Sequence, residues 1–269
     1  MRNALLAAAI LFCAGGAYAA DMPLKAPPVV PPAPTWTGWY IGINGGGGWG
    51  NVRSSAADVG PDTFFALANV PAVVAGGSQS FNMSGGLAGG QIGYLSQAGS
   101  AIVGLEAGFD WSGLRGSASN GPTVYPVTAP ATFAWRLQGK QDSLFTFLGR
   151  LGLNQGNWYP YLTGGAALAH QTYTATYIDT FYPSTSTNTF SKEALGWALG
   201  GGAEVRLADH WLLRGEYLYM QFDSFNGTGP IACTPGVGLC GGAPGFSTTF
   251  RYSSRFNESI GRVALSYKF

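Results

Sequence analysis

Hydrophobic and polar positions alternate with a period of two over long stretches of this chain. Between residues 194 and 207, Leu195 and Trp197 share one parity, whereas Glu204 and Arg206 share the other. A period of two is that of a β-strand with one apolar face. The same alternation recurs and predicts eight strands, at about residues 37–50, 80–95, 101–111, 142–154, 158–172, 194–207, 211–223 and 255–269.

The charged residues of these segments lie on the parity opposite to the apolar one. In 142–154, for example, Phe145 and Phe147 oppose Arg150. An Arg or Lys on the lipid face at mid-membrane costs roughly 2–4 kcal/mol, so this separation is typical of a membrane wall. The charges expected inside are Glu106, Asp110, Arg150, Glu204, Arg206, Arg214, Glu216, Glu258 and Arg262. We expect them to form a structural core of salt bridges; the alternative is a narrow, gated water path in which pairs exchange partners.

The strands of a soluble β-sandwich also alternate between apolar and polar residues, so the lengths of the connections are needed to distinguish it from a barrel. Short connections such as "SQAGS" and "ADH" alternate with long ones, at about 51–79, 113–140, 174–192 and 224–253. The polar parity is mostly glycine, alanine and paired charges, with few of the lysines of a solvated sheet. The prediction is an all-β fold, an eight-stranded antiparallel up-and-down transmembrane β-barrel with short periplasmic turns and long extracellular loops. The interior of such a barrel is just filled by side chains.

The stretch "WYIGINGGGGWG" contains a G-x-G-x-x-G pattern in Gly45, Gly47 and Gly50. A dinucleotide site would need a helix directly after it and an acidic residue some twenty residues on, and the following residues indicate neither. Trp39 and Trp49 instead lie one membrane crossing apart, as interfacial tryptophans do. We interpret the glycines as structural, relieving crowding inside a small barrel.

The N-terminus has the pattern of a secretory signal peptide. Arg2 precedes an apolar run too short to span a bilayer, and Ala17 and Ala19 form an A-x-A cleavage site. The predicted parts are a signal peptide at 1–19, a Pro-rich periplasmic leader at 20–35 and a barrel at 36–269. The leader is too rich in proline to pair and should form a semi-rigid spacer.

Composition agrees with export and adds two exclusions. The chain has 14 Lys and Arg against 13 Asp and Glu, and cleavage removes Arg2 alone, so the mature chain is neutral and shows no basic excess for nucleic acid. Cys233 and Cys240 remain after cleavage, an even number in an exported chain, and predict a disulfide that stiffens a loop tip rather than redox chemistry. His170 and His210 lie toward opposite barrel ends, so no metal or other cofactor is expected.

Several motifs resemble the small outer-membrane immunogenic β-barrel proteins of α-proteobacteria, which are similar to the OmpA transmembrane barrel. They are "WTGWYIGINGGGGWG", "GGQIGY", "VGLEAGFDW", "GRLGL", "RGEYLY" and "VALSYKF". The resemblance implies that the barrel-assembly machinery recognises the alternating end of the chain, at Val263, Leu265, Tyr267 and Phe269. It also implies a hypothesis for the mature N-terminus, with Ala20 as amine donor and Asp21 as recognition residue for a transpeptidase that links the protein to peptidoglycan. No peptidoglycan-binding domain of the OmpA kind is expected after the barrel.

The expected function is therefore structural rather than enzymatic. We expect an outer-membrane barrel that supports envelope integrity, contacts outer-membrane lipid and lipopolysaccharide, and is tethered to the cell wall through its leader. A narrow small-solute porin is the alternative. A lipid-modifying enzyme is disfavoured, because no G-x-S-x-G motif is present and the residues around His170 are a poor nucleophile–base pair.

Overall fold

The computed structural model describes residues 35–60, 64–234, 236 and 246–269. These belong to one compact unit, Thr35–Phe269. Its elements are β1 (Gly38–Asp58), η1 (Leu67–Asn69), α1 (Val70–Gly77), β2 (Ser80–Ala98), β3 (Ala101–Ser112), β4 (Arg115–Ser119), β5 (Thr123–Val124), β6 (Thr132–Leu153), β7 (Trp158–Asp179), β8 (Ser184–Arg206), β9 (Trp211–Phe222), β10 (Phe225–Ala232) and β11 (Ser247–Lys268). No helix among these described residues is long and apolar enough to cross a membrane.

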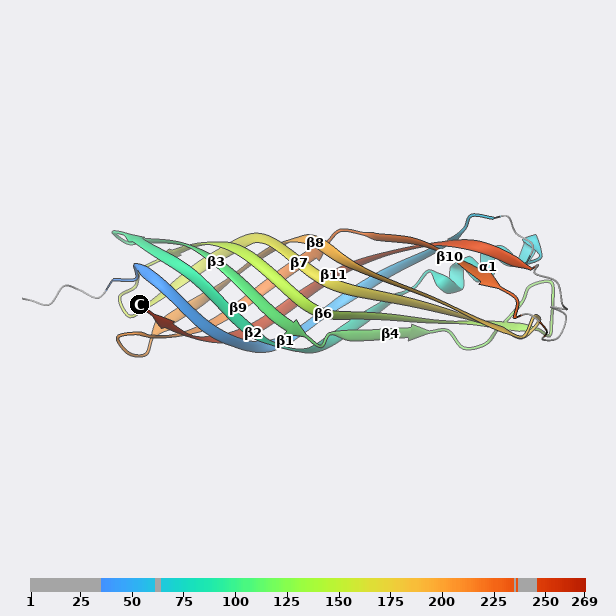
Figure 1. Cartoon of the computed structure of the whole chain (residues 1–269), viewed down its shortest axis with the longest axis horizontal. Coiled ribbons are helices and arrows are strands. Elements are labelled where there is room, and N and C mark those ends of the chain that lie inside the picture. The colour runs from blue at the N-terminus through green and yellow to red at the C-terminus, as the bar shows by residue number, and fades with distance from the viewer. Residues whose placement is uncertain (1–34, 61–63, 235, 237–245) are drawn as a thin grey trace, which may run out of the picture. The chain divides into compact units, whose positions relative to one another are not determined.

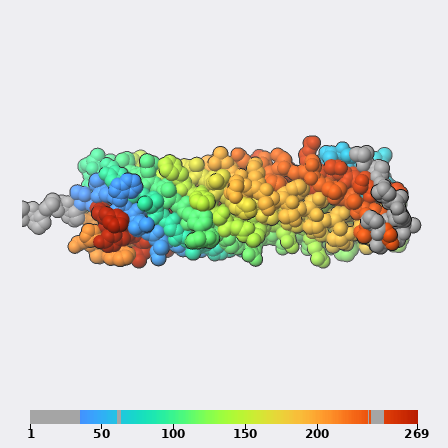
Figure 2. Space-filling view, viewed as in Figure 1, coloured from blue at the N-terminus to red at the C-terminus, as the bar shows by residue number. Residues whose placement is uncertain are grey.

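Eight of the strands close into a ring of antiparallel neighbours. The order is β1-β11-β9-β8-β7-β6-β3-β2, and β2 pairs back onto β1 (Figure 1). Figure 2 shows the first and last strands, blue and red, side by side at one end of the wall. The antiparallel all-β fold is as predicted, but the described residues form eleven strands, because β4, β5 and β10 add to the sheet from within the long connections.

The two ends of the ring differ. Strands are joined by short turns at 99–100, 154–157 and 207–210 at one end, which also carries residue 35 and the C-terminus. We call this the short-turn end. The long-loop end carries α1, β4, β5 and β10 (Figure 1).

Large apolar side chains cover the outside of the ring between two bands of aromatic residues. The band at the short-turn end includes Trp39, Trp158, Trp211 and Phe269, and the band farther along includes Trp49, Trp111, Trp197 and Tyr217, all 45–71% exposed. We call them the lower and upper girdles. Exposed aliphatic side chains such as Ile43, Leu151 and Val263 lie between them. Aromatic girdles flanking an apolar band are the outer surface of a membrane-spanning barrel.

The glycines of β1 are required where the strand faces the interior. A Cβ added at Gly46 would lie 2.1 Å from the carbonyl oxygen of Gly261, and one added at Gly42 would lie 2.6 Å from the carbonyl oxygen of Leu265. A side chain cannot be accommodated at either distance. These glycines therefore allow β1 to lie close to β11 where the ring closes.

The strands extend well past the upper girdle, and here the sequence-based boundaries are wrong. β6 begins at residue 132 rather than 142, and β7 ends at 179 rather than 172. In this extension the polarity is inverted: Phe133 and Trp135 point inward and are buried, whereas Arg136 is exposed. A register shift between Gln141 and Ser143 marks the change of parity on β6. Lipid-facing alternation therefore ends at the girdle, and much of the predicted loops is strand with an apolar inner face.

Candidate functional site

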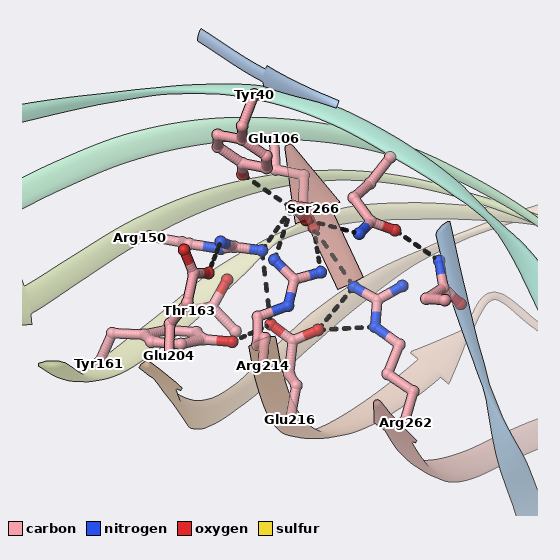
Figure 3. A network of polar contacts seen from close by, with 12 residues as sticks. Tyr40, Glu106, Arg150, Tyr161, Thr163, Glu204, Arg214, Glu216, Arg262 and Ser266 are labelled. Atoms are coloured by element: carbon pink, nitrogen blue, oxygen red, sulfur yellow. Dashed lines mark hydrogen bonds and ion pairs between the residues drawn. The ribbon is translucent and has the colours of Figure 1, made fainter. Parts of the chain in front are cut away.

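The interior at membrane level is filled by a network centred on Glu106 of β3 (Figure 3). Arg214 contacts both carboxylate oxygens, with Nη1–Oε2 at 2.6 Å and Nη2–Oε1 at 3.2 Å. Arg150 Nη2 donates to the same Oε2, and Arg262 Nη2 lies 3.4 Å from Oε1. The Tyr40 hydroxyl also donates to Oε2, at 2.7 Å. One carboxylate thus receives three guanidinium groups and a phenol.

A second carboxylate, Glu216 of β9, links the other side of the network. Its Oε2 accepts from Arg262 Nη2 at 2.6 Å and from Nε at 2.7 Å. The remaining acids complete the set: Asp110 Oδ2 lies 3.2 Å from Arg262 Nη1, and Glu204 Oε2 lies 3.4 Å from Arg150 Nη1. All seven charged side chains are at most 2% exposed.

The network ties strands that lie far apart in the sequence. Its acids and arginines come from β3, β6, β8, β9 and β11, while Tyr40 comes from β1 and Tyr161 of β7 donates to Glu216 Oε1 at 2.9 Å. The Arg150 guanidinium also lies over the Tyr161 ring, 4.9 Å from its centroid. Seven of the eight ring strands are therefore joined across the interior by polar contacts. Removing one member of such a buried set leaves an uncompensated charge, which typically costs about 3–5 kcal/mol.

Two of the nine predicted interior charges lie outside this network. Glu258 is buried but bonds to an amide, with Gln141 Nε2 donating to its Oε1 at 3.2 Å. Arg206 lies at the end of β8, where the short-turn end closes. The parity of the sequence identifies inward-facing positions, but it does not state at which height each charge lies.

The short-turn end is closed by Trp36, a residue that the sequence analysis assigned no role. Its side chain is fully buried, and the indole Nε1 donates to Asn154 Oδ1 at 3.0 Å. The Arg206 guanidinium stacks 4.4 Å from the indole ring centroid and donates to Thr35 O at 3.1 Å. Lys268 Nζ donates to the same carbonyl at 2.6 Å. This plug fixes the start of the described chain at the short-turn end.

The long-loop end is closed by an aromatic core and the helix α1. Val73 of α1 is fully buried, and its carbonyl accepts from Trp135 Nε1 at 3.0 Å. Above it, the hydroxyls of Tyr125 and Tyr177 both donate to Asp179 Oδ2. Burial, aided by Tyr125 and by the nearby Asp179 carboxylate, raises the pKa of Tyr177 well above its ordinary value. The interior is thus filled at three levels, by indole, by ion pairs and by aromatic rings.

Comparison with known proteins decides the family. The family model of the outer membrane protein beta-barrel domain matches residues 4–239.

The chain belongs to this family.

Two relatives confirm the resemblance seen in the sequence. The 31 kDa outer-membrane immunogenic protein of Brucella melitensis biotype 1 is 29% identical over 232 residues, which cover 84% of this chain and 89% of that protein. The 25 kDa outer-membrane immunogenic protein of Brucella abortus biovar 1 is 26% identical over 230 residues, covering 82% and 84%. Family and relatives place this protein in the cell outer membrane.

Solved structures are similar only at a distance. The outer membrane protease OmpT from Escherichia coli is 10% identical, with a TM-score of 0.48 over 86% of this chain and 97% of that one. A similarity at this level transfers no activity to the present family member.

The terminal residues assigned roles from the sequence are only partly described. Ala17, Ala19, Ala20, Asp21 and Cys240 lie outside the described residues. Cys233 is disulfide-bonded, and its pairing with Cys240 stays a prediction. The predicted assembly signal lies on the last strand, with Val263 and Leu265 on the outer surface of β11, Tyr267 packed against Trp211, and Phe269 71% exposed.

The histidines lie at the surface of this outer-membrane barrel. His170 Nδ1 is 2.7 Å from Glu193 Oε1 on the neighbouring strand, and Ser143 stands opposite His170 on β6. No hydrogen bond joins Ser143 to His170. Among the described residues, no group of three or more His, Cys, Asp or Glu could hold a metal ion.

Proposed function

We propose that this outer-membrane protein is a structural, non-conducting barrel that supports envelope integrity, with its short-turn end in the periplasm. The observation that carries the proposal is the filled interior, from Trp36 through the Glu106 network to the aromatic core. A water path would have to pass all three levels. Short turns on the periplasmic side and long loops outside are the rule for barrels of this kind, which supports the orientation.

We further propose that the leader tethers the barrel to peptidoglycan through Ala20, with Asp21 as recognition residue. Sixteen residues of semi-rigid, Pro-rich chain would reach about 50 Å at ~3.1 Å per residue. A tether needs a firm attachment at its barrel end, and Thr35 is held there by Arg206 and Lys268. The same end carries the short turns that the proposal places in the periplasm.

The tether is tested by mass spectrometry of boiled, muramidase-digested sacculi. We expect the peptide that begins at Ala20 to carry a muropeptide in the wild type and to lose it in Asp21→Lys. The matched control is Lys25→Asp, which alters charge four residues away in the same leader. If Ala20 is recovered only as a free amine, the tether hypothesis is contradicted, whereas the proposal of a closed barrel is not affected.

Closure is tested by single-channel recording in planar bilayers. The wild type should be silent, and Trp36→Ala should admit only small, brief events, because the Glu106 network still blocks the interior. Wild-type conductance steps that change in Arg150→Gln would instead support the alternative, a narrow small-solute porin. Greater detergent sensitivity of a deletion strain, restored by the wild-type gene, is the expected measure of envelope support.

We propose no enzymatic role. The relatives are named as immunogenic outer-membrane proteins, and Ser143 lacks the hydrogen bond to His170 that would activate it. Purified protein should leave lipid A unmodified. Hydrolysis that disappears in both Ser143→Ala and His170→Ala would contradict this.

A further inference from the structure

A band of polar and cationic side chains lies on the outer wall directly above the upper girdle. On β1, the outward-facing residues after Trp49 are Asn51 and then Arg53. On the adjacent β11 they are Asn257 and Arg255, and the two strands are paired so that Asn51 stands opposite Asn257 and Arg53 opposite Arg255. One amide row and one arginine row therefore follow the aromatic residues in order.

The two arginines are an unfavourable pair without a further partner. Like charges directly opposite on antiparallel strands destabilise the sheet. Both side chains are exposed, and no ion pair or hydrogen bond of either guanidinium is formed within the described part of the chain. Exposed Arg251 and Lys192 add further positive charge nearby. Asp223 is the acid that shares a groove with Arg255, and no ion pair joins them.

Two shallow grooves lie on the same part of the wall: Arg255 lines one, and Asn51 and Asn257, two positions below the arginine pair, line the other. The first, about 440 Å³, is lined by Trp49, Asn51, Asn82, Asn257 and Tyr219 among others. Its Asn51 Nδ2 donates to Asn82 Oδ1 at 3.2 Å, whereas the buried Asn257 Oδ1 accepts no hydrogen bond from any described residue. The groove therefore offers aromatic faces and amides, above the buried carboxylate of Glu258.

The second groove lies beside the first, around Arg255. It measures about 410 Å³ and is lined mainly by polar atoms, with Lys192, Trp197 and Gln221 among its residues. Gln221 is the cross-strand partner of Asn257. Beside Arg255, the two grooves hold one further cation, Lys192, two acids, Asp223 and the buried Glu258, and the amide row.

With the long-loop end outside the cell, as proposed, this band lies at the height of the headgroups of the outer leaflet. Ten residues separate Trp39 from Trp49, which at ~3.3 Å per residue and a tilt of ~40° span about 25 Å, the height of the apolar band of such barrels. By the same rise the amide row lies about 5 Å and the arginine row about 10 Å beyond Trp49. Acyl chains would thus contact the wall below Trp49, and a charged headgroup would meet the arginines.

We propose that Arg53, Arg255 and the adjoining grooves bind a phosphorylated, acylated glycolipid of the outer leaflet. Its phosphate would lie between the two guanidinium groups and neutralise their repulsion, with charge-assisted hydrogen bonds that favour arginine. Sugar hydroxyls would bond to the amide row, and the acyl chains would continue down the apolar wall. A sugar headgroup explains the amide row, which a simple phospholipid would leave unused. This inference rests on the proposed orientation, with the long-loop end outside the cell, but not on whether the barrel is closed or tethered.

The test is native mass spectrometry of the full-length folded protein, titrated with bis-phosphorylated lipid A. The double variant Arg53→Gln/Arg255→Gln should weaken binding about tenfold or more, a change of roughly 1.4 kcal/mol in binding free energy. The matched control is Arg136→Gln, an exposed arginine on β6 away from these grooves, which should bind as the wild type does. Asn257→Ala should weaken binding of lipid A and leave binding of phosphatidylglycerol unchanged.

Three results would overturn the proposal. If dephosphorylated lipid A binds as tightly as lipid A, the phosphate is not what the arginines bind. If phosphatidylglycerol binds as tightly, the site does not select a glycolipid. If the double variant binds lipid A unaltered while its barrel remains folded, as shown by resistance to SDS, the two arginines do not form the site. Conductance and sacculus measurements are unaffected by all three outcomes, so this proposal and the proposed function fail separately.

Discussion

Glu106→Gln should destabilise the barrel more than any other single conservative change in the network. The carboxylate accepts from Arg150, Arg214, Arg262 and Tyr40, and it is fully buried. Glutamine keeps the size but offers one oxygen, and its NH₂ group would point at guanidinium donors. Hydrogen bonds to charged groups contribute about 1.5–3 kcal/mol each and are not additive. The loss of two or more gives an expected decrease of roughly 3–5 kcal/mol in the free energy of unfolding, in line with broken buried ion pairs.

The assay is equilibrium unfolding by urea in lipid vesicles, followed by tryptophan fluorescence and extrapolated linearly to water. The matched control is Asp142→Asn, which breaks the ion pair of Asp142 Oδ1 with Lys140 Nζ at 2.7 Å. Those side chains are 41% and 44% exposed, so the control should lose at most about 1 kcal/mol. Equal, small losses in both variants would refute the conclusion that the buried network stabilises the ring.

Two further predictions concern the long-loop end. Val73→Asp places a carboxylate against Trp135 and should release α1 from the strands, seen as faster amide exchange over residues 70–77 with the girdle strands unchanged; unaltered exchange in α1 would contradict it. Because burial and the neighbours Tyr125 and Asp179 raise the pKa of Tyr177 above the unfolded value of 10.0, its contribution to stability is full below about pH 10 and lost as pH rises further. Near-ultraviolet circular dichroism should therefore show an alkaline loss of packing that Tyr177→Phe moves to higher pH, and an unmoved transition would argue against it.

The membrane-level wall could be predicted from the sequence because its signal is continuous. Lipid outside and charge inside leave one parity apolar, and the predicted strands at 80–95, 101–111 and 211–223 begin at the residues where β2, β3 and β9 begin. The strand segments beyond the upper girdle are not predicted, because there the outer face meets water and the apolar residues face inward. Phe133, Trp135 and Leu137 alternate with small or polar residues, from Thr132 to Gln138, with the same period of two as the lipid-facing strands. These segments become predictable if the apolar parity beyond the upper girdle is assigned to the inner face.

The sequence signals for the buried Trp36 and for the helix α1 are weaker than those for the membrane-level strands. Trp36 follows a Pro-rich stretch and precedes Trp39, so it is naturally interpreted as a second interfacial tryptophan. Only the contacts of Arg206 and Asn154, which are distant in sequence, turn it inward. The α1 sequence VPAVVAGG begins beside a proline and ends in two glycines, which favours a loop. Its helix depends on burial of Val73 against Trp135, a tertiary contact that local sequence does not encode.

The three levels of the interior use different chemistry because each has a different exterior. At membrane height most large apolar residues face the lipid. The inner parity holds glycine and charge beside a few buried aliphatic residues such as Leu148 and Leu218, and only mutual pairing makes those charges stable when buried. Beyond the upper girdle the outer parity faces water, which frees apolar residues to fill the inside as an ordinary aromatic core. At the short-turn end, Trp36 joins large side chains of the strands, such as Tyr40, Leu95 and Tyr159, in one buried cluster. The filling of the interior is thus a consequence of how each level of the wall meets its surroundings.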